Sequence, residues 1–240
     1  MIPLAVHFSM EAIDPQVRWL ASTLVYVLAY AVAAAAFWIA ARRRGMATHG
    51  VYIVAQAGLV GGLIGANVAQ FLATGAPGKA IEGGIVGGWL AVIIAKQWIG
   101  LRRPTGDLFA FALSAGEMIG RIGCFIGGCC FGKSAAIAWG VYDHGMLRHP
   151  TQLYLSAGAG ITLGLLVWLE RRGKLPENGI FYVQGLCFCA VRFSVDFFRD
   201  VSAPYAGLTL VQLACIAGFA LFVFKLAPML SRPKLRHEFA

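Results

Sequence analysis

Long apolar runs, each bounded by polar or basic residues, occupy most of this 240-residue chain. Hydrophobic residues make up 59% of the chain and charged residues only 13%. Such a composition is typical of a protein that folds in lipid, and it excludes a sizeable soluble domain. A helix needs about 20 apolar residues to cross the hydrocarbon of a bilayer. The stretches of suitable length are 19–41, 51–72, 83–99, 108–128, 152–169, 179–198 and 208–226.

These runs predict an all-α integral membrane protein with seven transmembrane helices, and residues 1–240 are expected to form a single transmembrane domain. Short cytoplasmic loops collect Lys and Arg. The basic clusters that follow alternate runs are Arg42 to Arg44; Lys96, Arg102 and Arg103; Arg171, Arg172 and Lys174; and Lys225, Arg232, Lys234 and Arg236. This alternation predicts an outside N-terminus and a cytoplasmic C-terminus. It also accounts for most of the net charge of +9 without a nucleic-acid partner.

Glycines four residues apart recur inside the runs, and small residues at this spacing let helix backbones approach closely in lipid. The pairs are Gly61 with Gly65, Gly83 with Gly87, Gly84 with Gly88, Gly116 with Gly120, and Gly160 with Gly164. We therefore expect these glycines to lie at helix interfaces.

Arginines inside two of the runs are the feature that helix packing does not explain. Arg121 and Arg192 would each place a guanidinium at membrane depth, which is costly unless the side chain faces the protein interior. Glu117 lies one turn before Arg121, and the triplet Arg192, Asp196 and Arg199 shares one helix face. Two carboxylates do not satisfy three arginines, so this set predicts a pocket for a phosphate or carboxylate. The alternative is an internal salt-bridge network that only holds helices together.

The segment from Arg148 to Tyr154 supplies further polar groups. Pro150 fits the first turn of the fifth helix, which would make His149 the N-cap on the outer side of the membrane. Helix N-termini favour anions, and a histidine there can exchange protons near neutral pH. Arg148, Gln152 and Tyr154 can all donate hydrogen bonds beside it.

Three ordered motifs carry a resemblance to a known family. They are Gly120 to Ile126 followed by Gly132, His149 to Tyr154, and Arg192-Phe193 leading to Asp196-Phe197-Phe198-Arg199. In order and spacing they resemble the prolipoprotein diacylglyceryl transferase family. The resemblance implies a multi-pass enzyme of the bacterial inner membrane that moves the diacylglyceryl group of phosphatidylglycerol to a cysteine thiol of a lipoprotein precursor. Glycerol phosphate would leave, and no metal or cofactor is expected.

The resemblance also implies roles for individual residues. Arg121 and Arg192 would hold the phosphodiester and stabilise the departing phosphate, and His149 would carry a proton or bind the head group. Further residues would attract, bind or orient the substrates. They are Arg199, Arg148, Lys133, Gln152, Tyr154, Asp196, Glu82, Cys124 and Cys129.

The chain departs from the family pattern at several polar positions. Cys124 and Gly127 stand where the family has asparagines, and Cys129 stands where it has a glutamate. Asp196 is a shortened glutamate, and Leu155 replaces another. Glu82 takes the place of a histidine and Leu63 that of an arginine. Binding of phosphatidylglycerol therefore carries over better than the identity of the acceptor, for which a glycan hydroxyl or a small molecule stays open.

The cysteines Cys124, Cys129 and Cys130 cluster near the outer end of the fourth run. Their spacing is not a C-x-x-C pair, and no second pair follows, which argues against a metal site. A disulfide or reactive thiol at Cys129 or Cys130 is one alternative, and plain packing is the favoured one. At the level of the whole chain, an anion transporter and a non-catalytic lipid-binding protein are the competing functions.

Overall fold

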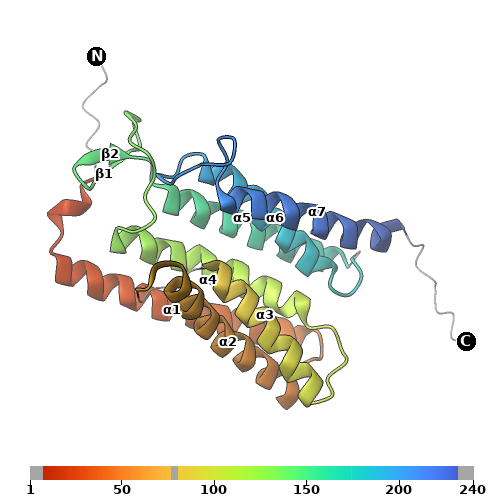
Figure 1. Cartoon of the computed structure of the whole chain (residues 1–240). Helices are drawn as coiled ribbons and strands as arrows, with labels where there is room; N and C mark the ends of the chain where they lie inside the picture. Colours follow the sequence, from red (N-terminus) through yellow and green to blue (C-terminus); the bar gives the residue numbers. More distant parts are fainter. Residues whose placement is uncertain (1–7, 77–80, 174, 232–240) are drawn as a thin grey trace, which may run out of the picture. The chain divides into compact units, whose positions relative to one another are not determined.

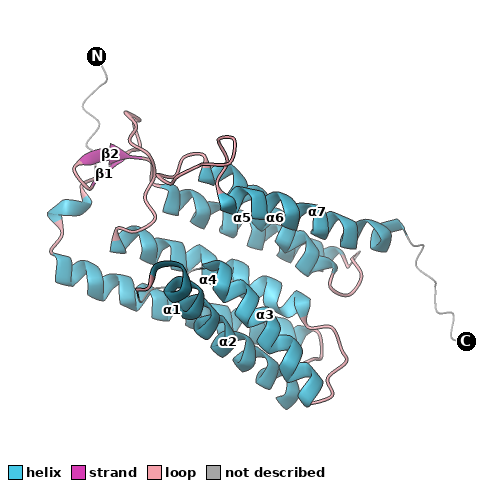
Figure 2. Ribbon diagram, viewed as in Figure 1, coloured by secondary structure: helices cyan, strands magenta, loops and turns pink. Residues whose placement is uncertain are grey.

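The computed structural model describes residues 8–76, 81–173 and 175–231. Lys174, Arg232, Lys234 and Arg236 lie outside the described residues, so the basic clusters to which they belong are described only in part. Figure 2 shows a chain built almost entirely of helices. The long helices are α1 (Pro15–Arg43), α2 (His49–Thr74), α3 (Ile81–Trp98), α4 (Gly106–Gly127), α5 (Thr151–Arg172), α6 (Gly179–Asp196) and α7 (Leu210–Ser231). A short 3-10 turn, η1 (Met10–Ala12), and a hairpin of β1 (Val141–Asp143) and β2 (Met146–Arg148) complete the fold.

Each long helix lies near one of the seven predicted runs. Among the described residues, six of the seven helices are long and apolar enough to cross a membrane, namely α1, α2, α4, α5, α6 and α7. The prediction of an all-α integral membrane protein is confirmed. A seventh span at α3 and the orientation of the chain stay predictions.

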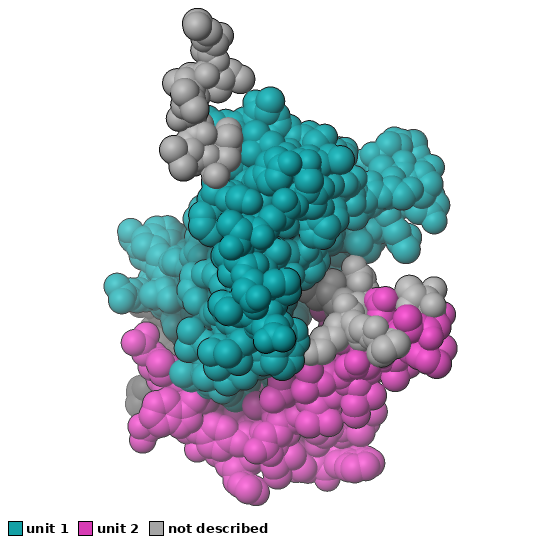
Figure 3. Space-filling view, turned by 90° about the vertical axis from the view of Figure 1, so that its left-hand side faces the viewer, with its two compact units in different colours: residues 1–37, 106–240 teal, residues 38–105 magenta. Residues whose placement is uncertain are grey.

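The chain forms two compact units, coloured separately in Figure 3. Unit 2, residues 38–105, is built around α2 and α3, which lie side by side (Figure 1). A methyl group added at Gly61, Gly65, Gly83 or Gly87 would collide with the backbone of the facing helix. The close approach predicted from glycine spacing is therefore confirmed for this pair.

Unit 1, residues 1–37 and 106–240, holds α4 to α7 and most of α1. α4 packs against α5 and α6, and α6 packs against α7. The Ser22 hydroxyl of α1 donates to the carbonyl of Gly123 in α4 at 2.9 Å. The predicted glycine interfaces are confirmed here at Gly116 and Gly160, where an added methyl group would lie 3.0 Å from Ala33 Cβ of α1 and 3.1 Å from Met118 Sδ of α4. At Gly164 the prediction is wrong, because no described atom lies within 4 Å of such a methyl group.

The hairpin lies at the end of unit 1 where α4 finishes and α5 begins (Figure 1). Its strands are antiparallel, with Val141 opposite Arg148. The two turn residues, His144 and Gly145, both have positive φ, of 52° and 73°. Two successive left-handed residues make the tight turn that matches the twist of a two-stranded hairpin. No motif or spacing in the sequence predicted this hairpin.

Candidate functional site

The first buried arginine, Arg121 of α4, is held by the carboxylate one turn before it. Its Nε and Nη2 both donate to Oε1 of Glu117, at 3.3 and 3.2 Å. Both side chains are largely buried, with 10% of the Arg121 side chain and 18% of the Glu117 side chain exposed. The helix therefore fixes this guanidinium in the interior of unit 1, as the spacing of the two residues predicts.

The second group of charges lies at the end of α6 and surrounds Asp196. Oδ1 of this carboxylate lies 3.5 Å from Nη2 of Arg192 and accepts a hydrogen bond from Nη1 of Arg199 at 3.2 Å. Only 1% of the Asp196 side chain is exposed. The shared face predicted for the three residues is confirmed.

Thr209, just before α7, completes this group. Its hydroxyl donates to Oδ2 of Asp196, and it also accepts from the backbone N–H of Gln212 at 3.0 Å. In turn, Oε1 of Gln212 accepts a hydrogen bond from the backbone N–H of Thr209 at 2.9 Å. This reciprocal pair is a capping box that begins α7 and ties it to the charged end of α6. Sequence reasoning missed both residues, although Thr-x-x-Gln before an apolar run is the signal for such a box.

A small cavity between α4, α5 and α6 lies beside both arginine groups. Glu117 and Arg192 line it, together with Ser114, Thr162 and Gln184. It has room for about one water molecule. Within the described part of the chain, the buried hydroxyl of Ser114 has no hydrogen-bond partner. This polar lining joins the surroundings of Arg121 to those of Arg192.

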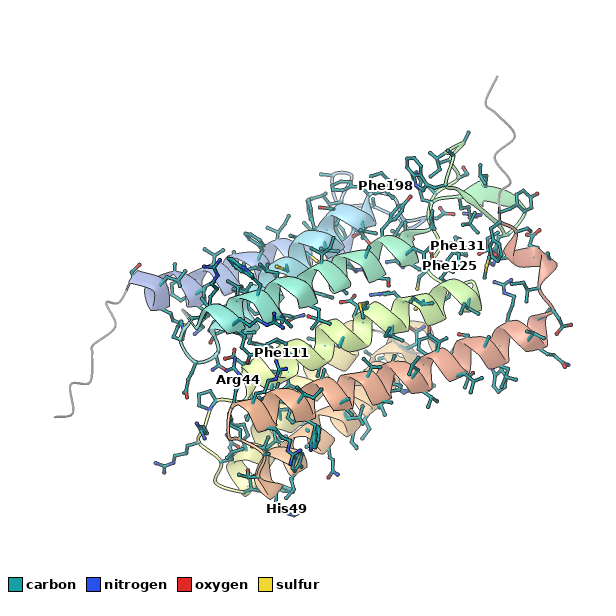
Figure 4. The ribbon with its side chains drawn as sticks, turned by 180° about the vertical axis from the view of Figure 1, so that it is seen from behind. Arg44, His49, Phe111, Phe125, Phe131 and Phe198 are labelled. Atoms are coloured by element: carbon teal, nitrogen blue, oxygen red, sulfur yellow. The ribbon has the colours of Figure 1, made fainter. Side chains whose placement is uncertain are left out.

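Backbone pairing gathers the loop residues at the same end of unit 1. The N–H of Gly132 donates to the carbonyl of His149 at 3.1 Å, and the N–H of His149 donates to the carbonyl of Lys133 at 3.1 Å. The N–H of Lys133 in turn donates to the carbonyl of Phe198 at 2.8 Å. Figure 4 shows Phe125, Phe131 and Phe198 together at this end, whereas Phe111 lies toward the other end of α4. The three sequence motifs therefore meet in space.

This pairing also corrects the predicted position of His149. α5 begins at Thr151 with Pro150 as its N-cap, so His149 precedes the cap and is not the cap itself. The reason is that both backbone groups of His149 are engaged with Gly132 and Lys133, which holds the residue in an extended connection rather than at a helix start.

The His149 ring is oriented by a chain of hydrogen bonds. Its Nδ1 lies 3.1 Å from the Tyr154 hydroxyl, which lies 2.7 Å from Nε1 of Trp139. An indole N–H can only donate, so the Tyr154 oxygen accepts from Trp139 and its own proton is available for His149. With Nδ1 accepting, we assign the proton of the neutral ring to Nε2.

Arg148 is buried in the loop, and several of its donors are engaged there. Its Nη1 donates to Asp200 Oδ2 at 2.8 Å and to the Gly132 carbonyl at 3.1 Å, and its Nε donates to the Asp143 carbonyl at 3.1 Å. Its guanidinium also lies 4.4 Å from the centre of the Phe131 ring. These contacts hold the hairpin against the end of α6, while its role toward a head group stays a prediction.

The residues after α4 are fixed by the first turn of α5. Gln152 Nε2 donates to the Cys129 carbonyl at 2.6 Å, and the Thr151 hydroxyl donates to the Cys130 carbonyl at 2.9 Å. The Sγ atoms of Cys124, Cys129 and Cys130 all lie within 4.8 Å of one another. Hydrogen bonds from the other two thiols lower the pKa of Cys130, and the charges of Arg199 and Arg121 add to this.

Lys133 and Glu82 are the two remaining residues predicted for the site. Lys133 is exposed beside the loop pairing. Glu82 belongs to α3 of unit 2, and its side chain lies outside the described residues.

Comparison with known proteins identifies the family. A family model described as prolipoprotein diacylglyceryl transferase matches residues 63–227, which is more than half of the chain. The chain belongs to the prolipoprotein diacylglyceryl transferase family. The predicted family is confirmed.

Three relatives, each named phosphatidylglycerol–prolipoprotein diacylglyceryl transferase, illustrate the extent of the similarity to this family. The protein of Nitratidesulfovibrio vulgaris is 32% identical, over 76% of this chain and 76% of its own length. The protein of Pseudomonas paraeruginosa is 33% identical, over 62% of each chain. That of Campylobacter curvus is 30% identical, over 65% of this chain and 54% of its own length. The chain thus spans between about half and three quarters of these relatives.

Proposed function

We propose that this chain transfers the diacylglyceryl group of phosphatidylglycerol to the thiol of a lipobox cysteine in a prolipoprotein and releases glycerol phosphate. The proposal rests on membership of the family, on relatives named for this activity, and on the buried arginines of unit 1.

The proposal that phosphatidylglycerol is the donor rests on the charge balance of the buried groups. In the part of the chain that the structure describes, Arg121, Arg192 and Arg199 form ion pairs with two carboxylates, Glu117 and Asp196. The set therefore has an excess of one positive charge, which the phosphodiester of phosphatidylglycerol would neutralise. Within the described residues, the buried Nε of Arg199 also has no hydrogen-bond partner.

The reaction follows from this arrangement. A thiolate sulfur attacks the glyceryl carbon that bears the phosphate, the C–S bond forms, and the C–O bond breaks. The electron pair leaves with the glycerol phosphate, whose developing charge Arg121 and Arg192 stabilise. Because the guanidiniums are already held by Glu117 and Asp196, little reorganisation is needed when the charge develops.

The other predicted residues complete the site in this proposal. His149, with its proton on Nε2, passes a proton or binds the head group, and Tyr154 orients its ring. Arg199, Arg148 and Lys133 attract the anionic lipid, and Asp196 and Gln152 position their neighbours. Cys124 and Cys129 lie on the acceptor side. Glu82 is proposed as an orienting carboxylate from α3.

The proposed membrane arrangement is a single transmembrane domain of residues 1–240. It crosses the bacterial inner membrane seven times, with the N-terminus outside and the C-terminus in the cytoplasm. Arg42, Arg43, Arg171 and Arg172, at the ends of α1 and α5, support this orientation, because basic residues concentrate on the cytoplasmic side.

Release of glycerol phosphate from labelled phosphatidylglycerol tests the donor half of the proposal. Arg121→Ala and Arg192→Ala should each abolish turnover, while Lys225→Ala removes an exposed cation of α7 and serves as the matched control. Thermal unfolding of each variant in detergent separates loss of function from loss of fold. Full turnover by both folded arginine variants would contradict the proposal. If the wild type and the folded variants all bind phosphatidylglycerol but none releases glycerol phosphate, the result would instead favour a lipid-binding protein.

A further inference from the structure

The three cysteines that lie close together in the sequence at the end of α4 also bring their thiols together in space. The Sγ atoms of Cys124, Cys129 and Cys130 lie within 4.8 Å of one another, and the three cysteines are not in disulfides. Cys129 is exposed, and the other two are half-buried.

The end of the helix explains why the thiols converge. Gly128 has a φ of 71°, its N–H donates to the carbonyl of Phe125 at 3.2 Å, and the N–H of Cys129 donates to that of Cys124 at 3.2 Å. These two bonds are the Schellman pattern, in which the residue after the left-handed glycine folds back over the last turn of the helix. Cys129 is thereby brought back to Cys124.

Cys130 reaches the same point through an unusual backbone conformation. Its φ of 61° lies in the left-handed region, which a side-chain-bearing residue rarely adopts. The conformation is held by Thr151, which binds its carbonyl, and by Gln152, which binds that of Cys129. The backbone of the two loop cysteines is therefore held in place by α5.

Groups around the cluster favour negative charge on sulfur. The Tyr26 hydroxyl of α1 lies 3.1 Å from Sγ of Cys124, and with a thiolate there the phenol is the donor. Arg121 precedes Cys124 by three residues on the same helix, and Arg199 forms an isolated antiparallel bridge with Gly132, two residues after Cys130. Neighbouring cations favour the thiolate form of cysteine, which is the form that binds a metal, and a hydrogen-bond donor beside the sulfur orients it as the groups around metal ligands do.

We propose that Cys124, Cys129 and Cys130 form a three-thiolate site for a thiophilic divalent cation of the Zn²⁺ type, with a fourth coordination position left open for the acceptor thiol. Three protein ligands and one open position are the arrangement of reactive zinc sites. Zn–S bonds of about 2.3 Å place tetrahedral thiolates about 3.8 Å apart. The present separations therefore need only a small contraction.

The second part of this inference rests on the proposed function. An acceptor cysteine that binds at the open position loses its proton to water, since a thiol coordinated to the metal is deprotonated. Its sulfur then carries the electron pair that forms the C–S bond with the glyceryl carbon, and glycerol phosphate leaves as described above. This arrangement would supply a thiolate at neutral pH in a chain that has cysteines where the family has polar residues.

Metal binding is measured on the full chain in detergent, reduced and stripped with a chelator, then titrated with Zn²⁺, and with Co²⁺ as a spectroscopic probe. Two triple variants are compared. One replaces Cys124, Cys129 and Cys130 with serine, and the matched control replaces Cys187, Cys189 and Cys215 of α6 and α7. Wild type and control should retain about one Zn²⁺ per chain and show thiolate–Co²⁺ charge-transfer absorption. Absence of bound metal in the reduced wild type, or equal binding by the cluster variant, would overturn the site.

The exposed position of Cys129 provides a variant with little effect on packing. Cys129→Ser alone should weaken Zn²⁺ binding at least about tenfold, and unchanged affinity would also overturn the site.

Acceptor peptides test the open position. A lipobox peptide should raise the charge-transfer absorption of the Co²⁺ protein by about a third, because the number of thiolates bound to the metal rises from three to four. The same peptide with serine in place of cysteine should leave the absorption unchanged. A metal that binds but does not respond to the cysteine peptide overturns the open position. That result leaves the proposed function intact, because glycerol phosphate release is measured separately.

Discussion

Glu117 holds Arg121 through a single carboxylate oxygen, Oε1, which accepts from both Nε and Nη2 of the guanidinium. The two residues are four apart on α4, so formation of the helix brings their side chains within reach of each other. A guanidinium in this position is fixed before any lipid arrives. The orientation of the Arg121 guanidinium depends on the Glu117 carboxylate, and substitution of either residue tests this dependence.

Replacing either partner of this pair with glutamine should leave the other charge buried and unpaired. Glu117→Gln and Arg121→Gln should each lower the free energy of unfolding by about 3–5 kcal/mol, and the double variant should lose less than the sum. Thermal unfolding in detergent gives the four values. Strict additivity would show that the two side chains do not interact in solution.

Asp196 should tolerate a longer carboxylate better than a neutral amide. It accepts from Arg199 and Thr209 and pairs with Arg192, so Asp196→Asn removes the charge that these groups share. We expect turnover to fall roughly tenfold to a hundredfold, the effect of losing a hydrogen bond to a charged group. Asp196→Glu should retain more activity than Asp196→Asn, and the opposite order would refute the assigned role.

Tyr154 is expected to act through His149. Tyr154→Phe removes the hydroxyl that faces Nδ1, so the neutral ring is no longer held in one tautomer, and kcat should fall by about two- to tenfold. The pH profile of kcat should also move, which a purely structural role would not cause. Tyr142→Phe removes an exposed hydroxyl that donates to the Gly145 carbonyl, and it should behave as wild type. An unchanged rate and pH profile in Tyr154→Phe would refute the coupling.

Thr209 should contribute to stability as the cap of α7. Thr209→Val keeps the shape of the side chain but removes both the capping bond and the donor to Asp196. A loss of about 1–2 kcal/mol in the free energy of unfolding is expected. Thr23→Val serves as the comparison, since its hydroxyl only donates to the Trp19 carbonyl on an exposed face of α1. Equal losses in the two variants would argue against the cap.

The helices and the charged pairs of the site were predictable from the sequence for a simple reason. A run of about 20 apolar residues and a spacing of three or four residues act within one helix, so periodicity alone reveals them. The pairs of Glu117 with Arg121 and of Asp196 with its arginines are of this kind. The spacing of Gly61 with Gly65 and of Gly83 with Gly87 is also of this kind, whereas the meeting of α2 with α3 at these glycines is a tertiary contact.

Features that depend on tertiary contacts could not be read in this way. His149 precedes the N-cap because its backbone pairs with Gly132 and Lys133, which are distant in the sequence. The thiol cluster depends on two left-handed residues, Gly128 and Cys130, and spacing does not reveal them. The bond from Thr209 to Asp196 was missed because it joins the start of α7 to the end of α6.

The most direct test of the central claim follows the acceptor thiol. The purified chain is incubated with phosphatidylglycerol and a lipobox-containing prolipoprotein peptide, and the peptide mass is measured. Wild type should add one diacylglyceryl group to the peptide cysteine, and Arg121→Ala should add none. Release of glycerol phosphate with no change in peptide mass would show that the chain uses another acceptor. Neither release nor modification by the folded wild-type protein would contradict the transferase account.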